Sequence, residues 1–230
     1  MVFRMKKASI VLIAGFLLVM SGNAYAFLSV PSFGDTGWQT YTHTFETAWT
    51  GRVGFLVSNS GDKLVDSEML VDNLNFGPTG NRGFENSPEH FAGYDATNGD
   101  ITVVSSDTAA SGNVYTPTEN DFMARISSLN GIFDSTVLGG TNAAVLWLTD
   151  DISVEAGQTV QFDWAFLARD YMPFQDFAGL VHQDRLVTGG YSEFGFEKLA
   201  QIEDVVPEPA TMSLFGLGLF GLLGLRKRRG

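Results

Sequence analysis

The stretch Thr159-Val160-Gln161-Phe162-Asp163-Trp164-Ala165-Phe166-Leu167-Ala168 decides the fold. Large apolar residues occupy every second position of its first eight residues, namely Val160, Phe162, Trp164 and Phe166. Gln161 and Asp163 fall between them. A period of two places the apolar set on one face of a β-strand and the polar set on the other. The stretch therefore predicts a strand whose apolar face lies in a core.

Comparable strand signals recur on both sides of this stretch. Segments rich in β-branched and aromatic residues, as strands prefer, are 38–47, 53–57, 69–76, 101–104, 143–148, 177–181 and 195–202. The run 143–148 is apolar throughout, which predicts a strand covered on both faces. Pairs such as Asn98-Gly99 and Asn130-Gly131 mark turns between the segments. Helical signals are nearly absent, so many short strands at this spacing predict an all-β sandwich or barrel.

Two further segments are less clear. Residues 122–129 fit a strand or a helical turn equally well. Residues 77–98 are polar and rich in glycine, with no period, and predict a long ordered loop.

The N-terminal residues have the order of a secretory signal peptide. Arg4, Lys6 and Lys7 form a basic region, and residues 8–20 are apolar. Ala24-Tyr25-Ala26 has the small-x-small pattern of a cleavage site. We expect cleavage after Ala26; the alternative is an uncleaved N-terminal anchor.

The C-terminal residues combine a hinge, an apolar run and a basic cluster. Pro207-Glu208-Pro209 precedes residues 212–225, which carry no charge and are followed by Arg226, Lys227, Arg228 and Arg229. A helix over 212–225 would span roughly 21 Å, short against a hydrocarbon core of about 30 Å. The basic cluster favours the cytoplasmic side. Because proline cannot continue a helix, the Pro-Glu-Pro hinge is expected at the outer face.

This arrangement closely resembles the PEP-CTERM sorting signal of Gram-negative bacteria that make extracellular polysaccharide. The resemblance implies exosortase, a membrane protease, as a partner that cuts near the Pro207-Glu208-Pro209 hinge. It also implies transient anchoring in the inner membrane before delivery to the cell surface or extracellular matrix. The alternative is a permanent C-terminal anchor. The expected organisation is a signal peptide at 1–26, a β-sandwich domain at 27–205 and a sorting signal at 206–230.

The charge of the domain differs from that of the whole chain. Seven of the 14 basic residues but only one of the 26 acidic residues lie in the two end segments, so the domain carries 7 − 25 = −18. Such a surface repels nucleic acid, and no nucleic-acid partner is expected. The chain has no cysteine, which excludes disulfides, cysteine-based metal sites and cysteine nucleophiles.

Catalytic motifs are missing. His43, His90 and His182 do not have the spacing of metal ligands. The nearest approach to a nucleophile elbow, residues 190–194, lacks the final glycine. With 25 acidic residues in the domain, a pair at the separation that glycosidases use would arise by chance. We therefore expect no enzymatic activity and no catalytic residues.

Two kinds of binding residue are candidates. Asp163, Asp170 and Asp176 lie in and after the strand at 159–168, and hard cations such as Ca²⁺ prefer carboxylate oxygens. They are candidate calcium ligands, with a solvated acidic surface as the alternative; no other cofactor is expected. Tyr171 and Phe174 lie in a predicted loop and could stack on sugar rings, or could pack back onto the core.

A second resemblance concerns the domain. Residues 51–74 and 157–181 are similar to segments of jelly-roll domains in PEP-CTERM and other surface-anchored bacterial proteins. Their order is reversed here, which a sandwich with adjacent termini tolerates. The resemblance implies a jelly-roll-like β-sandwich.

Together these observations predict an exported, surface-sorted and non-enzymatic protein. It would be a structural or adhesive component of the envelope or of the extracellular polysaccharide matrix. A carbohydrate-binding module of that matrix is the alternative, and a glycan-active hydrolase is the third hypothesis.

Overall fold

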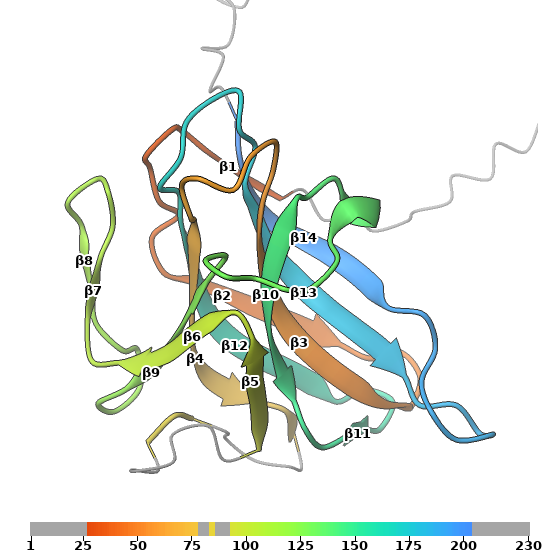
Figure 1. Cartoon of the computed structure of the whole chain (residues 1–230). Coiled ribbons are helices and arrows are strands. Elements are labelled where there is room, and N and C mark those ends of the chain that lie inside the picture. Colours follow the sequence, from red (N-terminus) through yellow and green to blue (C-terminus); the bar gives the residue numbers. More distant parts are fainter. Residues whose placement is uncertain (1–26, 78–82, 86–92, 204–230) are drawn as a thin grey trace, which may run out of the picture.

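The computed structural model describes residues 27–77, 83–85 and 93–203 (Figure 1). In this part the chain forms β-strands and a 3₁₀ turn, η2 at Thr136–Leu138, without an α-helix. The prediction of an all-β domain is therefore confirmed. The segments predicted as the signal peptide, 1–26, and as the sorting signal, 206–230, lie outside the described residues.

The named strands form two larger sheets and one hairpin. The first sheet has the order β1-β14-β13-β3-β10-β5, with β11 beside β3. Its strands are β1 (Leu28–Val30), β3 (Trp49–Asn59), β5 (Tyr94–Asn98), β10 (Asn142–Leu148), β11 (Ile152–Val154), β13 (Phe177–Asp184) and β14 (Gly195–Ile202). The second sheet has the order β2-β12-β4-β9-β6. Its strands are β2 (Gln39–Thr44), β4 (Glu68–Asn75), β6 (Asp100–Val104), β9 (Met123–Ser127) and β12 (Thr159–Leu167). The hairpin pairs β7 (Asp107–Thr108) with β8 (Val114–Tyr115).

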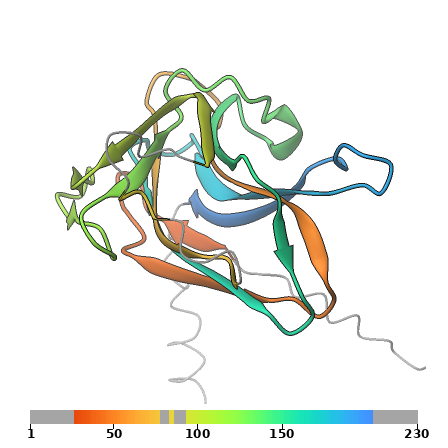
Figure 2. The same ribbon diagram turned by 90° about the horizontal axis from the view of Figure 1, so that it is seen from below.

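The two larger sheets enclose a shared apolar core. Phe55 of β3 and Phe162 of β12 meet edge to face across it, with ring centroids 5.0 Å apart. The same core contains the predicted apolar face of β12, namely Val160, Phe162, Trp164 and Phe166. That face assignment is confirmed. Figure 2 shows the two sheets as layers on either side of this core.

Both sheets are also covered on their outer faces. Trp147 of β10 and Phe177 of β13 lie in a second apolar cluster, packed against Phe133 and Phe194. Strand β10 is buried at every position, as its uninterrupted apolar run predicts. Leu167 of β12 lies in a third cluster with Tyr115 of the β7–β8 hairpin.

The structure corrects one predicted loop and resolves one ambiguity. Tyr94–Asn98, predicted as the end of a long loop, forms β5 and pairs with β10. Its residues are mostly polar and show no alternating pattern. The strand is held instead by backbone pairing and by the buried Tyr94. Residues 78–82 and 86–92 of that loop lie outside the described residues. The ambiguous segment at 122–129 contains a strand, β9.

The two segments that resemble jelly-roll sequences pair with each other. Strand β3 pairs with β13 in the first sheet, and β4 pairs with β12 in the second. Each segment therefore contributes one strand to each layer of the domain. The jelly-roll assignment is finer than this pairing and stays a prediction.

The end of β14 defines one end of the domain. The Glu203 amide donates to the Val30 carbonyl at 2.9 Å, and the Ile202 amide donates to the Asp176 carbonyl at 2.9 Å. The loops after β1 and before β13 thus lie beside the point where the chain leaves β14 (Figure 1). The connection from β13 to β14 lies at the opposite end (Figure 1).

Candidate functional site

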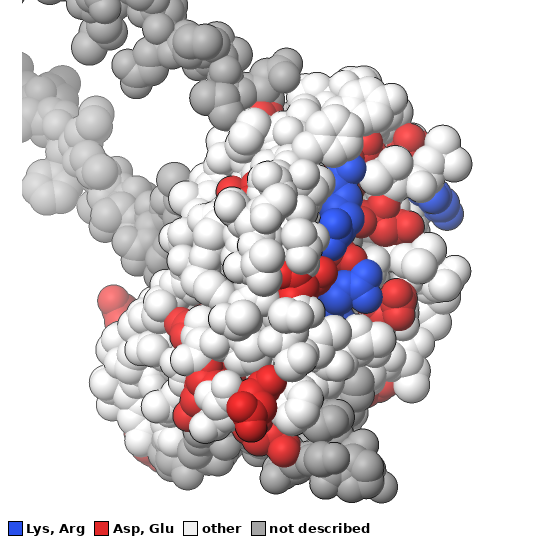
Figure 3. All heavy atoms as spheres, turned by 90° about the vertical axis from the view of Figure 1, so that its left-hand side faces the viewer, with Lys and Arg blue, Asp and Glu red and all other residues white. Residues whose placement is uncertain are grey.

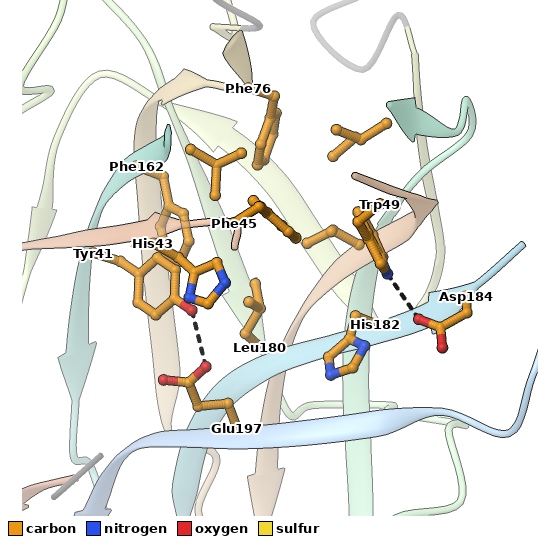
Figure 4. Close-up of a pocket in the computed structure, with 13 residues that line it drawn as sticks. Tyr41, His43, Phe45, Trp49, Phe76, Phe162, Leu180, His182, Asp184 and Glu197 are labelled. Atoms are coloured by element: carbon orange, nitrogen blue, oxygen red, sulfur yellow. Dashed lines mark hydrogen bonds between the residues drawn. The ribbon is translucent and has the colours of Figure 1, made fainter. Parts of the chain in front are cut away.

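A pocket of about 350 Å³ lies between the two sheets (Figure 4). Strands β2 and β12 line it on one side, and β3, β11, β13 and β14 line it on the other. The buried part of its lining is apolar and consists of Val53, Phe76, Ile152, Val160, Phe162 and Leu180. The residues nearer solvent are aromatic or polar, namely Tyr41, His43, Phe45, Trp49, His182, Asp184 and Glu197. A largely apolar cavity with a few polar groups near its opening is typical of a small-ligand site.

Aromatic rings make up one wall of the pocket. Phe45 stacks on Trp49, with ring centroids 5.5 Å apart and planes inclined by 22°. Tyr41 stacks on Phe162 at 4.8 Å, and His43 meets Phe45 edge to face at 4.6 Å. The rings therefore support one another and leave a preformed aromatic surface.

Two carboxylates border the pocket. The Tyr41 hydroxyl donates to Glu197 Oε2 at 2.9 Å, and Trp49 Nε1 donates to Asp184 Oδ1 at 2.8 Å (Figure 4). Within the described part of the chain, Glu197 Oε1 is buried and has no hydrogen-bond partner. A buried acceptor without a donor costs free energy. A ligand hydroxyl or a water molecule could supply that donor.

The sequence did not reveal this pocket. His43 and His182 both line it, although the sequence showed only that they lack the spacing of metal ligands. The only local signal is the alternation of Tyr41, His43 and Phe45 toward one face. The other lining residues come from strands far apart in the chain, so their convergence depends on the fold.

The predicted glycan residues lie together at a different place. Tyr171 and Phe174 meet edge to face with centroids 5.5 Å apart, and Tyr171 stacks on Phe33 at 5.8 Å. Tyr171 is 47% exposed and Phe33 is 48% exposed. None of the three lines the pocket, so they form an aromatic surface separate from it.

Two of the predicted calcium ligands share one neighbourhood. Asp176 is buried and accepts hydrogen bonds from the Ser60 amide at 2.9 Å and the Ser67 hydroxyl at 2.7 Å. Burial raises the pKa of Asp176 to about 7, and the negative charges of Asp170 and Asp62 act in the same direction. Asp170 is 1% exposed, and burial also raises its pKa. Its Oδ2 has no hydrogen-bond partner among the described residues.

The third predicted ligand belongs to a separate network. Asp163 of β12 accepts hydrogen bonds from Thr40 Oγ1 at 2.7 Å and Asn73 Nδ2 at 2.9 Å. Across residues 27–77, 83–85 and 93–203, no group of three or more histidine or acidic side chains is arranged to hold a metal ion. The predicted set of three is therefore not brought together. Only the pair Asp170 and Asp176 remains as a candidate.

A network of charged side chains crosses the second sheet. Glu68 of β4 pairs with both Arg125 and Arg169, and Asp107 pairs with the same two arginines. Burial raises the pKa of Glu68, and the two positive charges oppose that shift. Figure 3 shows basic and acidic side chains interleaved on the left-hand side of Figure 1. Because every charge of this network has a counter-charge, we assign it a structural role.

The residues predicted for processing lie outside the described residues. They are Ala24 and Ala26 of the signal cleavage site and Pro207, Glu208, Pro209, Arg226, Lys227, Arg228 and Arg229 of the sorting signal. In the part of the chain that the structure describes, no helix has the length and apolar character needed to cross a membrane. The predicted spanning segment at 212–225 is not in that part.

Comparison with known proteins addresses this C-terminal segment. A family model described as the PEP-CTERM protein-sorting motif matches residues 205–229. No curated protein and no solved structure matches the chain. The matched residues contain Pro207-Glu208-Pro209, the apolar run and the basic cluster. The motif implies exosortase as the processing partner and membrane-associated sorting to the cell surface. The chain therefore carries a PEP-CTERM protein-sorting motif at residues 205–229, and this motif supports its assignment as an exosortase substrate.

Proposed function

We propose that this protein is a non-enzymatic structural or adhesive component of the cell envelope or of the extracellular polysaccharide matrix. The observation that carries the proposal is the PEP-CTERM motif at residues 205–229. Residues 1–26 direct export, and the helix at 212–225 holds the chain in the inner membrane until exosortase cuts near Pro207-Glu208-Pro209. The released unit is a jelly-roll-like β-sandwich.

The described domain suits a role outside the cell. Its two sheets share one core, and apolar clusters also cover their outer faces. It therefore needs no disulfide, and the chain has no cysteine to form one. A net charge of −18 over residues 27–205 favours solubility.

Deleting the exosortase gene in the host bacterium tests this proposal. We expect the protein to lose its surface location and to accumulate in the inner-membrane fraction with residues 207–230 attached. A periplasmic protein without a sorting motif serves as the control and should not move. An unchanged surface amount of this protein in the deletion strain would contradict the proposal.

Carbohydrate binding is the second candidate function, and the pocket favours it. The apolar face of a sugar ring can stack on the rings of Tyr41, Phe45 or Trp49. A sugar hydroxyl can donate to Glu197 Oε1, which is otherwise unpartnered among the described residues. An adhesive role and glycan binding are compatible, because a bound matrix polysaccharide would hold the domain in place.

We predict that Trp49→Ala and Glu197→Gln each weaken saturable binding of the host's own polysaccharide at least tenfold. Tenfold corresponds to about 1.4 kcal/mol, the loss of one good stacking or hydrogen-bond contact. Isothermal titration with purified polysaccharide measures it, and circular dichroism checks the fold of each variant. Tyr171→Ala is the matched control. Binding lost in Tyr171→Ala but kept in Trp49→Ala would move the site to Tyr171 and Phe174.

Incubation of the same polysaccharide with the protein tests for a hydrolase. Asp184 and Glu197 both line the pocket, and glycosidases use two carboxylates. Under the proposed non-enzymatic function, the polysaccharide keeps its chain length during prolonged incubation. New reducing ends that appear with the native protein and not with Glu197→Gln would show a hydrolase instead.

Calcium binding is a further proposal, restricted to Asp170 and Asp176. Both are buried, and Asp170 Oδ2 lacks a partner among the described residues. Protons compete with a cation at Asp176, whose pKa is raised to about 7, so the comparison belongs at pH 8. We predict a higher melting temperature in millimolar Ca²⁺ than in chelator, since a ligand at one hundred times its dissociation constant adds about 2.7 kcal/mol. Identical melts would leave these carboxyls without a cation.

A further inference from the structure

Three loops meet at the end of the domain where β14 stops. They are residues 31–34 after β1, residues 60–67 after β3 and residues 168–176 before β13, and we call them together the tip. The Phe33 amide donates to the Asp170 carbonyl at 3.0 Å, and the Ser60 amide donates to Asp176 Oδ1 at 2.9 Å. These bonds hold the three loops as one unit beside the last residues of β14 (Figure 1).

The tip exposes large apolar side chains. Phe33 is 48% exposed, Tyr171 is 47% exposed and Leu64 is 84% exposed. The rings of Phe33 and Tyr171 stack on each other, so these two side chains form a continuous aromatic surface. Each loop therefore contributes at least one exposed apolar residue or ring to the same end of the domain.

The backbone at Phe33 is strained. Its φ is +57°, in the left-handed region that a bulky residue rarely adopts. Strained backbone persists where surrounding structure enforces it, and it concentrates at functional sites. Here the strained residue presents an aromatic ring to solvent, although burial of that ring would have stabilised the fold. A strained backbone with an exposed aromatic ring is what a contact surface would show at the tip.

The length of the following chain places the tip near the membrane. Glu203 is the last described residue, and its amide bonds to Val30 at the base of the tip. The apolar run of the sorting motif begins at Met212, nine residues later. A fully extended chain advances at most about 3.6 Å per residue, so this tether reaches about 30 Å. While the tail is anchored, the tip is the end of the domain tied closest to the bilayer.

We propose that the tip rests on the lipid–water interface of the inner membrane until exosortase cuts the chain. Phe33, Tyr171 and Leu64 lie among the headgroups, where aromatic side chains are favoured. The proposal rests on the anchoring described under the proposed function. The domain's net charge of −18 repels anionic lipid, so the contact depends on the tether. Cleavage therefore releases the domain, and until then the contact keeps the Pro-Glu-Pro hinge close to the membrane surface.

The absence of cysteine in the chain allows a clean depth measurement. A nitroxide on Leu64→Cys reports on the tip, and a nitroxide on Val187→Cys, in the β13–β14 connection at the opposite end, is the matched control. The labelled full chain is reconstituted into vesicles of phosphatidylethanolamine and phosphatidylglycerol, and into vesicles of phosphatidylcholine. Accessibility to oxygen and to a water-soluble nickel complex gives the depth of each label. We expect the Leu64 label to lie in the interface in both vesicles and the Val187 label to lie in water.

The possible outcomes separate this inference from the anchoring on which it rests. If the chain does not float with the vesicles, the anchoring itself is wrong. If it floats but the Leu64 label is as accessible to nickel as the Val187 label, the tip does not touch lipid and the inference is overturned.

A tip variant tests the aromatic contact itself. Phe33→Asn combined with Tyr171→Ser keeps a residue that tolerates positive φ and should return the Leu64 label to water. An immersed label in this variant would contradict the proposed role of the two rings. Cleavage of the same variant is also measured in cells. If the label of the unmodified tip lies in water and the variant is not cleaved, the tip contacts exosortase, and the lipid proposal fails.

Discussion

Trp164→Ala should lower the free energy of unfolding of the domain by about 3–5 kcal/mol. Trp164 is 5% exposed and lies in the core that the two sheets share, within the strand whose alternating pattern defines the fold. Its removal leaves a cavity that β4 on one side and β2 on the other cannot fill without moving. Chemical denaturation of residues 27–205, followed by tryptophan fluorescence and far-ultraviolet circular dichroism, measures the loss.

Val187→Ala is the matched control for this prediction. Val187 is fully exposed in the β13–β14 connection, and its truncation should change stability by less than about 0.5 kcal/mol. Equal stabilities for Trp164→Ala and the native domain would mean that the face assignment of β12 is wrong.

The second large effect concerns sorting. Glu208→Ala, or deletion of Arg226 to Arg229, should leave most of the protein as an uncut precursor in the inner membrane or misplace it. We expect a membrane-embedded protease to reach Pro207-Glu208-Pro209, because proline cannot continue a helix. Basic residues after an apolar run favour the cytoplasmic side of the membrane. Fractionation followed by immunoblotting separates the precursor from the shorter surface form.

Glu203→Ala provides the control for Glu208→Ala. Glu203 is the last described residue of the domain, and its carboxylate accepts a hydrogen bond from Ser29 Oγ. Loss of this partly exposed contact should leave processing intact. Normal cleavage of Glu208→Ala, or a loss in Glu203→Ala of the same size, would show that the hinge carboxylate has no special role.

The sequence predicted the strands whose apolar pattern can be recognised without knowing which strands they pair with. The core face of β12 follows from alternation alone, and the burial of β10 follows from its unbroken apolar run. Tyr94–Asn98 shows no such pattern and could not be predicted, since β5 is held mainly by pairing with β10. Short strands such as β1 and β11 contain too few residues to show a period.

The same distinction applies to the binding residues. Asp170 and Asp176 are close in sequence and meet in one loop, whereas Asp163 points away from the core on β12 and bonds to Thr40 and Asn73. The pocket draws its lining from six strands, so no local pattern could have assembled it. The aromatic surface at Tyr171 also includes Phe33, which comes from a distant loop and was not predicted.

The sorting signal could be read from the sequence because its physics is local. Its three parts, Pro-Glu-Pro, an apolar run and a basic cluster, follow one another in the sequence. No tertiary contact is needed to bring them together. The family match at residues 205–229 covers these three parts. The candidate binding surfaces of the domain are instead formed by residues far apart in the chain.

The intact mass of the surface form tests the central claim most directly. Surface material is released from intact cells, purified and analysed by mass spectrometry, with sequencing of its C-terminal peptide. The account predicts a chain that ends near Pro207-Glu208-Pro209 and yields no peptide from residues 214–225. A surface form that retains residues 212–225 would show that the C-terminal segment is a permanent anchor and would contradict sorting by exosortase.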